Sequence, residues 1–136
     1  MSRSIFVVLS GIVCAIMTTY FACKYYRCSD AQEQLPVYLY KIISVEDWDT
    51  SQRGDRLKLP AFDDAFIHLA KEDQLDRIIA KFWGDKSRYV VLKVDPKLFI
   101  GRLAYEANPG GTSKFYHLYD GFIPLDAVIK VMIVEK

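Results

Sequence analysis

An uninterrupted apolar stretch near the amino terminus sets the strongest limit on what this chain of 136 residues can fold into. Residues 4–23, SIFVVLSGIVCAIMTTYFAC, contain no charged side chain. A helix rises about 1.5 Å per residue, so a stretch of this length can cross a hydrocarbon layer roughly 30 Å thick. The sequence therefore predicts that residues 1–28 form an N-terminal membrane anchor, with membrane lipid as the partner of residues 4–23.

The ends of this stretch indicate which kind of membrane segment it is. Its last aromatic side chains are followed by the basic Lys24 and Arg27, which is typical of a membrane interface and favours a single-pass helix that is retained. A cleaved signal peptide is the alternative, although its apolar core would be shorter. The basic groups on the two sides are nearly balanced, and their slight excess favours a cytoplasmic carboxyl-terminal domain.

The remainder of the chain has the composition of an ordinary globular domain. Residues 29–36 are polar and predict a linker, and residues 37–136 are expected to form one globular domain. The three cysteines lie at positions 14, 23 and 28, so this domain can be neither a disulfide scaffold nor a thiolate zinc site. From Pro36 onward, fifteen Lys or Arg residues balance fifteen Asp or Glu residues. That balance argues against a nucleic-acid backbone as partner, because binding it needs a basic surface.

The apolar pattern of the domain switches between strand and helix. Runs rich in β-branched and aromatic residues predict strands at residues 37–43, 66–70, 89–95, 115–119 and 128–134, and one within residues 97–106. Ser44 is placed to cap a short helix anchored by Trp48, and residues 124–127 predict one helical turn. Residues 71–84 predict the main helix, with an apolar face made of Leu75, Ile78, Ile79, Phe82 and Trp83. This order predicts an α+β fold with a small mixed or antiparallel sheet.

The two histidines of the chain stand in matching phrases, FIHLA at residues 66–70 and FYHLY at residues 115–119. Side chains alternate along a strand, so each histidine shares its face with an aromatic neighbour. An isolated histidine in an apolar strand is commonly a half-buried core group whose N–H is bonded to a carbonyl oxygen. The repeated setting supports the alternative interpretation, in which His68 and His117 face one site.

Two further polar residues are candidates for the same site. Gln74 stands near the start of the main helix, within a turn or two of His68. Glu106 ends an apolar stretch just before a glycine-rich turn, where it is either a solvated turn residue or a carboxylate that reaches a cleft. A zinc site made of the histidines and Glu106 is disfavoured because no helical H-E-x-x-H spacing occurs. The absence of a G-x-S-x-G elbow and of a phosphate-binding glycine pattern argues against the common hydrolases and nucleoside triphosphatases.

Several short motifs, taken in order, resemble one family of uncharacterised proteins. They are YKI, FIHL followed by Gln74, VLKVD, LAYE, and FYHLY followed by IPLDAV. Between Val37 and Val134 this order is similar to the "domain of unknown function 952" family, which is thought to share the fold of the ADP-ribosyltransferase superfamily. The resemblance implies a split small sheet with a cleft that holds NAD in active members.

The resemblance also implies roles for particular residues. Glu106 would stabilise the positive charge that develops on the ribose as nicotinamide leaves, and His68 and His117 would complete the catalytic set by orienting ribose or phosphate. The residues implied in cofactor binding are Lys41, His68, Gln74, His117 and Tyr119. At Lys41 the chain departs from the many members that resemble Tyr-His-Ile, which argues against catalysis by this domain and leaves anion binding open.

Two functional hypotheses follow. The first is a membrane-tethered enzyme or enzyme-like domain, a transferase that acts on NAD or a nucleotide-derived substrate, and it rests on the paired histidines and the family pattern. The second is a non-catalytic membrane-anchored module that binds a small ligand or a protein, and it rests on the anchor and on Lys41. Convergence of His68, His117 and Glu106 on one concave pocket would support a ligand site.

Overall fold

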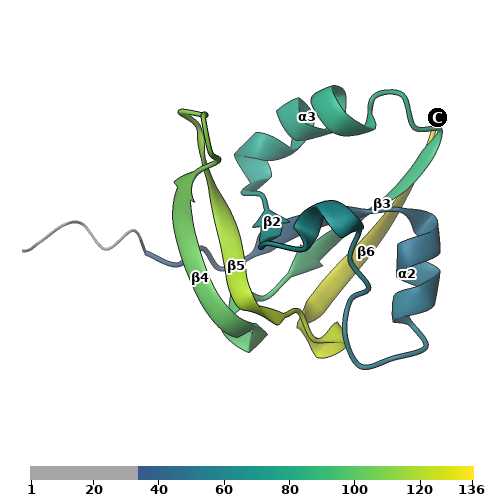
Figure 1. Ribbon diagram of the computed structural model, residues 1–136. Helices are drawn as coiled ribbons and strands as arrows, with labels where there is room; N and C mark the ends of the chain where they lie inside the picture. The colour runs from purple at the N-terminus through teal and green to yellow at the C-terminus, as the bar shows by residue number, and fades with distance from the viewer. Residues whose placement is uncertain (1–33) are drawn as a thin grey trace, which may run out of the picture. The chain divides into compact units, whose positions relative to one another are not determined.

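The computed structural model describes residues 34–136, in which six strands form two three-stranded sheets (Figure 1). The first sheet has the order β1-β3-β6 and the second the order β2-β5-β4, and all neighbouring strands within them are antiparallel. Leu35–Lys136 form one compact unit. The strands are β1 (Leu39–Ile43), β2 (Ile67–Leu69), β3 (Arg88–Val94), β4 (Ile100–Ala107), β5 (Lys114–Phe122) and β6 (Val128–Glu135).

The two sheets are joined where β1 passes the end of β2. Tyr40 and Ala70 pair there, and the backbone N–H of each donates to the carbonyl oxygen of the other at 2.9 Å. This junction brings Lys41, the next residue of β1, close to the strand that carries His68. The first predicted strand therefore contributes directly to the surroundings of the histidines.

The helices lie in the connections between strands. Ser44 caps α2 (Val45–Ser51) as predicted, because its hydroxyl accepts a hydrogen bond from the Asp47 N–H at 3.0 Å. The main helix continues from α3 (Leu75–Ile78) into a π-helical segment, η3 (Ile79–Trp83). Short 3-10 turns form η1 (Ala61–Asp63), η2 (Glu72–Gln74), η4 (Pro96–Leu98) and η5 (Leu125–Ala127).

Apolar side chains of both sheets form the main core. Its buried members include Leu39, Ile43, Ile67, Leu69, Val90, Leu92, Val94, Tyr116 and Leu118. Because side chains alternate along a strand, the opposite face of β2 and β5 lies outside this core. A second cluster joins α3 and η3 to the other face of the first sheet, where they pack against Tyr40, Ile42, Tyr89 and Val91 (Figure 1).

The predicted apolar face of the main helix is correct at four positions and wrong at Phe82. The other four side chains pack against the first sheet, whereas Phe82 is 60% exposed. The turns of a π-helix are wider than those of an α-helix, so the spacing of three and four residues no longer repeats along one side of η3. Trp83 therefore faces the sheet while its neighbour Phe82 points into solvent.

The predicted fold class and location are wrong in their membrane-spanning element. No helix within residues 34–136 has both the length and the apolar character that a membrane crossing requires. A span needs about 20 apolar residues, whereas α2 has seven residues and η3 has five. Residues 4–23, on which the predicted anchor (1–28) and single-pass location rested, lie outside the described residues. The fold is corrected to an α+β domain with two small antiparallel sheets, none of them mixed, and one main helix.

Candidate functional site

Four of the predicted site residues gather on one face of the second sheet. In the antiparallel register His68 of β2 lies directly opposite His117 of β5. Strand alternation places Glu106 of β4 and Tyr119 of β5 on the same side, together with Phe66, which immediately precedes β2. We call these five residues the histidine face. They lie on the side of the sheet that does not contribute to the main core.

The two imidazoles pack together beside one phenylalanine ring. The ring centroids of His68 and His117 are 5.3 Å apart in an edge-to-face arrangement. The Phe66 ring lies 4.8 Å from that of His68, 4.2 Å from that of His117 and 5.2 Å from that of Tyr119. Edge-to-face and tilted contacts of this kind are the ones that aromatic rings favour. The imidazoles thus belong to one cluster rather than to two separate environments.

A carboxylate from a turn holds the His68 imidazole. The Asp63 Oδ1, at the end of η1, lies 2.8 Å from His68 Nδ1 and also accepts the His68 backbone N–H at 3.1 Å. The other carboxylate oxygen lies 2.5 Å from the Nζ of Lys41, which in addition donates to the His68 carbonyl oxygen at 3.2 Å. Lys41, Asp63 and His68 therefore form one continuous polar chain from the first sheet to the histidine face.

The charged groups of Lys41 and Asp63 are buried. The Asp63 side chain is 0% exposed and that of Lys41 is 3% exposed. Burial by itself raises the pKa of Asp63, but the hydrogen bond from His68 and the charge of Lys41 outweigh it, so the pKa of Asp63 lies below its ordinary value. Burial lowers the pKa of Lys41, and the charge of Asp63 offsets only part of that effect. Because an ionised carboxylate can only accept, Nδ1 of His68 is the donor and its Nε2 is the ring nitrogen that carries the lone pair.

A second carboxylate holds the His117 imidazole. Glu106 Oε1 lies 3.2 Å from His117 Nδ1 and accepts the Tyr119 hydroxyl at 2.5 Å. The hydrogen bonds from Tyr119 and then from His117 lower the pKa of Glu106, and the bond to Glu106 raises the pKa of Tyr119. Burial lowers the pKa of His117, and Glu106 offsets part of this shift. At neutral pH the pair is an ionised carboxylate and a neutral imidazole with its proton on Nδ1.

His117 Nε2 is a buried acceptor without a partner. His117 is 1% exposed, and its Nε2 forms no hydrogen bond within residues 34–136. Within the same residues, Oδ1 of Asn108 in the turn after β4 is the one other buried side-chain atom without a hydrogen bond. An unsatisfied buried acceptor costs about 1–3 kcal/mol. Two acceptors of the second pair are thus left for other groups, His117 Nε2 and the Glu106 Oε2, which also has no bonded partner in the described residues.

Two arginines flank this side of the sheet. The Arg102 guanidinium of β4 lies 4.5 Å from the Tyr119 ring centroid, and the Arg77 guanidinium of α3 lies 5.8 Å from that of Phe115. Both side chains belong to exposed residues. Guanidinium groups over aromatic rings are held in place while their N–H donors stay available to anions. The histidine face therefore has cationic groups at its margins and acceptors at its centre.

Lys41 and Gln74, the other two predicted cofactor-binding residues, have protein partners. The Lys41 ammonium is engaged by Asp63, as described above. The Gln74 amide donates to the Lys114 carbonyl oxygen at 2.8 Å, and its oxygen accepts the Lys71 backbone N–H at 2.9 Å. Gln74 thereby connects the start of the main helix to β5. Ligand binding by Lys41 or Gln74 stays a prediction, and it would require these bonds to be shared or exchanged.

Sequence reasoning missed Asp63 and Arg102. Asp63 marked only the boundary before a strand, because the η1 turn that folds it back onto His68 leaves no pattern in the sequence. Arg102 reaches Tyr119 across the strand pair, and the bulge between Ile100 and Arg102 shifts the register there. Strand assignment with the correct pairing would have revealed Arg102, whereas Asp63 required the tertiary structure.

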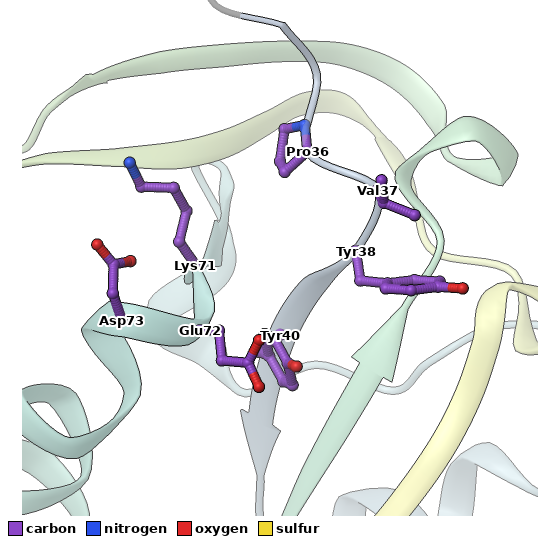
Figure 2. A pocket seen from close by; sticks show the side chains of 7 residues that line it. All are labelled: Pro36, Val37, Tyr38, Tyr40, Lys71, Glu72 and Asp73. Carbon is purple, nitrogen blue, oxygen red and sulfur yellow. The ribbon is translucent and has the colours of Figure 1, made fainter.

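Within residues 34–136 the histidine face belongs neither to a metal-binding cluster nor to either of two cavities of the domain. Within residues 34–136, no three His, Cys, Asp or Glu side chains are placed to hold a metal ion. A cavity of about 370 Å³ lies between the segment before β1 and the start of η2, where the ring of Tyr40 faces the Glu72 carboxylate (Figure 2). Another, of about 480 Å³, lies between α2 and η1 and is lined in part by Asp63. None of the five residues of the histidine face lines either cavity.

These features define a small α+β domain with two imidazole–carboxylate pairs on one sheet. The chain belongs to the DUF952 family, described as proteins of unknown function, whose sequence model matches residues 42–131. The family resemblance predicted from the motifs is therefore confirmed. No curated protein matches the chain.

Three solved structures similar to this chain are of protein CC0527 from Caulobacter crescentus. The X-ray structure of protein CC0527 from Caulobacter crescentus is 30% identical in sequence, with a TM-score of 0.63, over 72% of this chain and 86% of that chain. A double mutant of CC0527 gives the same values. The solution NMR structure of CC0527 is 29% identical, with a TM-score of 0.61, over 74% of this chain and 86% of that chain.

Proposed function

We propose that the histidine face binds NAD or a related nucleotide and that the domain acts as an ADP-ribosyltransferase-like protein. The observation that carries the proposal is the Glu106 carboxylate. It is 43% exposed, fixed at one oxygen by Tyr119 and His117, and unbonded at the other within the described residues. A carboxylate that is both fixed and accessible is suited to electrostatic work on a ligand.

The proposed role of Glu106 is to stabilise a cation that develops on the ribose. When the bond between the ribose C1′ and the nicotinamide nitrogen breaks, its electron pair leaves with nicotinamide and the ribose becomes positively charged. An ionised carboxylate already held in place stabilises that charge without having to reorganise. The hydrogen bonds from Tyr119 and His117 lower the pKa of Glu106 and so keep it ionised near neutral pH.

The surroundings of Glu106 also suit a nucleotide. Phe66 offers a half-buried aromatic ring, which can stack on a planar base. Arg102 lies close enough to influence the pKa of Glu106 and is exposed, so it is available to a diphosphate. His68 would orient a phosphate or ribose oxygen through its Nε2, with Asp63 fixing the ring.

The test is to add NAD in the millimolar range to the purified protein, then follow its melting temperature and the release of nicotinamide. A ligand at a hundred times its Kd stabilises the folded state by about 2.7 kcal/mol, so binding should raise the melting temperature by several degrees. The Glu106→Gln variant should still bind NAD but release nicotinamide roughly 100-fold more slowly. The matched control is Glu46→Gln, which neutralises an exposed carboxylate on α2.

Two results would decide against this function. If NAD, ADP-ribose and nicotinamide all leave the melting temperature unchanged, nucleotide binding is wrong. If NAD binds and nicotinamide release is equal in the Glu106→Gln and unmodified proteins, the transferase role of Glu106 is wrong. The Glu46→Gln variant should match the unmodified protein in both measurements.

A non-catalytic binding module is the second candidate, and the position of Lys41 favours it. Its ammonium is buried against Asp63 and offers no exposed donor to a ligand. A domain of this kind would be stabilised by a small molecule or a protein without consuming it. Stabilisation by NAD with no nicotinamide release, in both the unmodified and the Glu106→Gln protein, is the result that would select this candidate.

A further inference from the structure

His117 Nε2 restricts which ligand groups can bind beside it on the histidine face. The ring is 1% exposed, and Nε2 has no partner in the described part of the chain. Its Nδ1 is 3.2 Å from Glu106 Oε1, which accepts the ring proton. Nε2 consequently carries a lone pair, and only a group with an N–H or O–H can satisfy it.

The surroundings of Nε2 oppose an anion at this atom. Glu106, whose Oε1 lies 3.2 Å from Nδ1 of the same ring, is ionised, and Asp63 is bonded to the neighbouring His68. The two arginines that could balance an anion stand over the rings of Tyr119 and Phe115 instead. The diphosphate of a dinucleotide, whose oxygens carry no proton at neutral pH, would therefore face the lone pair of the imidazole without a donor of its own.

We infer that His117 Nε2 accepts a hydrogen bond from an uncharged donor of the ligand, a hydroxyl or amide on its nucleoside part, and that phosphates bind elsewhere on the face. This inference rests on the proposed function and specifies the orientation of the ligand in the site. The nucleoside end lies beside the rings of His117 and Phe66, whose centroids are 4.2 Å apart. The phosphate end lies toward Arg102 at the margin.

The chain itself makes the test simple, because it contains two histidines. With 15N-labelled histidine, the nitrogen spectrum of the whole protein contains the signals of two rings. We expect the His117 Nε2 signal to move upfield when adenosine or NAD is added, as an unprotonated ring nitrogen does when it accepts a hydrogen bond. Inorganic pyrophosphate, which has the charge without the nucleoside, should leave this signal in place.

The His68 ring is the internal control and the melting temperature is the parallel readout. If NAD raises the melting temperature while the His117 Nε2 signal stays fixed, the inference is wrong and the proposed function stands. If pyrophosphate alone moves that signal, the atom belongs to a phosphate site and the inference is also wrong. A signal already upfield in the free protein and unchanged by every probe means that a resident water molecule satisfies Nε2, and the inference is then wrong. If no probe alters either readout, the inference fails together with nucleotide binding.

Discussion

The two imidazole–carboxylate pairs of the histidine face are built in opposite ways. In the first pair the Asp63 side chain is 0% exposed and that of His68 is 37% exposed. In the second pair the Glu106 side chain is 43% exposed and that of His117 is 1% exposed. A buried carboxylate needs a buried cation, which Lys41 supplies, whereas an exposed one is solvated. The first pair therefore stabilises the fold and leaves the His68 imidazole accessible to solvent. The second pair leaves the charged Glu106 carboxylate accessible to solvent.

The largest effect expected from this contrast follows removal of Asp63. The Asp63→Ala substitution leaves the Lys41 ammonium buried without its counter-charge, and it takes the acceptor from two His68 N–H groups. Breaking one partner of a buried ion pair costs about 3–5 kcal/mol of folding free energy. Urea unfolding monitored by circular dichroism measures the loss.

Substituting both members of the ion pair tests whether the unpaired charge of Lys41 causes this loss. A Lys41→Met and Asp63→Asn double variant should regain part of the stability lost in Asp63→Ala, because no unpaired charge remains. A cost below about 1 kcal/mol for Asp63→Ala would mean that the ion pair of Lys41 and Asp63 is not what secures the junction of the two sheets.

Acidification should destabilise the protein in two separate ranges. Burial depresses the pKa of His117 below its ordinary 6.5, so the unfolded chain takes up this proton first and stability falls as the pH drops below about 6.5. The pKa of Asp63 lies below its ordinary 3.8, so its contribution is complete above that value and is lost as the pH falls further. Unfolding midpoints measured across this pH range should record both losses.

The assignment of the upper range to His117 can be checked directly. A His117→Gln variant should lack the loss of stability that begins near pH 6.5 and keep the one that begins near pH 3.8. If the upper loss persists in this variant, another group causes it.

A smaller effect is expected at Tyr119. The Tyr119→Phe substitution removes the main hydrogen bond that lowers the pKa of Glu106, so this pKa should rise toward its ordinary 4.5. Because Glu106 remains solvated, the loss of folding stability should be well below that of Asp63→Ala. Carbon-13 NMR titration of the Glu106 carboxyl measures the pKa, and an unchanged value would show that Tyr119 does not tune the carboxylate.

The smallest effect on folding is expected at Arg102. This residue is exposed and its guanidinium touches the Tyr119 ring, so Arg102→Ala should change the stability by at most about 0.5 kcal/mol. Its effect on NAD affinity should exceed that, because a charge-assisted bond to phosphate is lost. The exposed Arg53, in the loop after α2, provides the matched control substitution.

Much of the local structure could be predicted from the sequence. Strand alternation in FIHLA and FYHLY predicted which side chains share a face with each histidine, and Ser44 predicted the start of α2. These features depend on neighbours along the chain, which the sequence lists directly. The predicted membrane-spanning element is not among the helices of residues 34–136. Phe82 does not lie on its predicted face, because the helix widens at η3.

The order of residues predicts the family, the α+β pattern and the functional groups available, which are two imidazoles and a few carboxylates in apolar strands. The folded structure was needed to show that His68 and His117 lie opposite each other and that each is held by its own carboxylate. It also assigned Lys41 to Asp63 and left His117 Nε2 without a partner in the described residues. The physical reason is that burial and pairing arise from contacts between residues distant in sequence, and no local pattern encodes which strand will lie beside which.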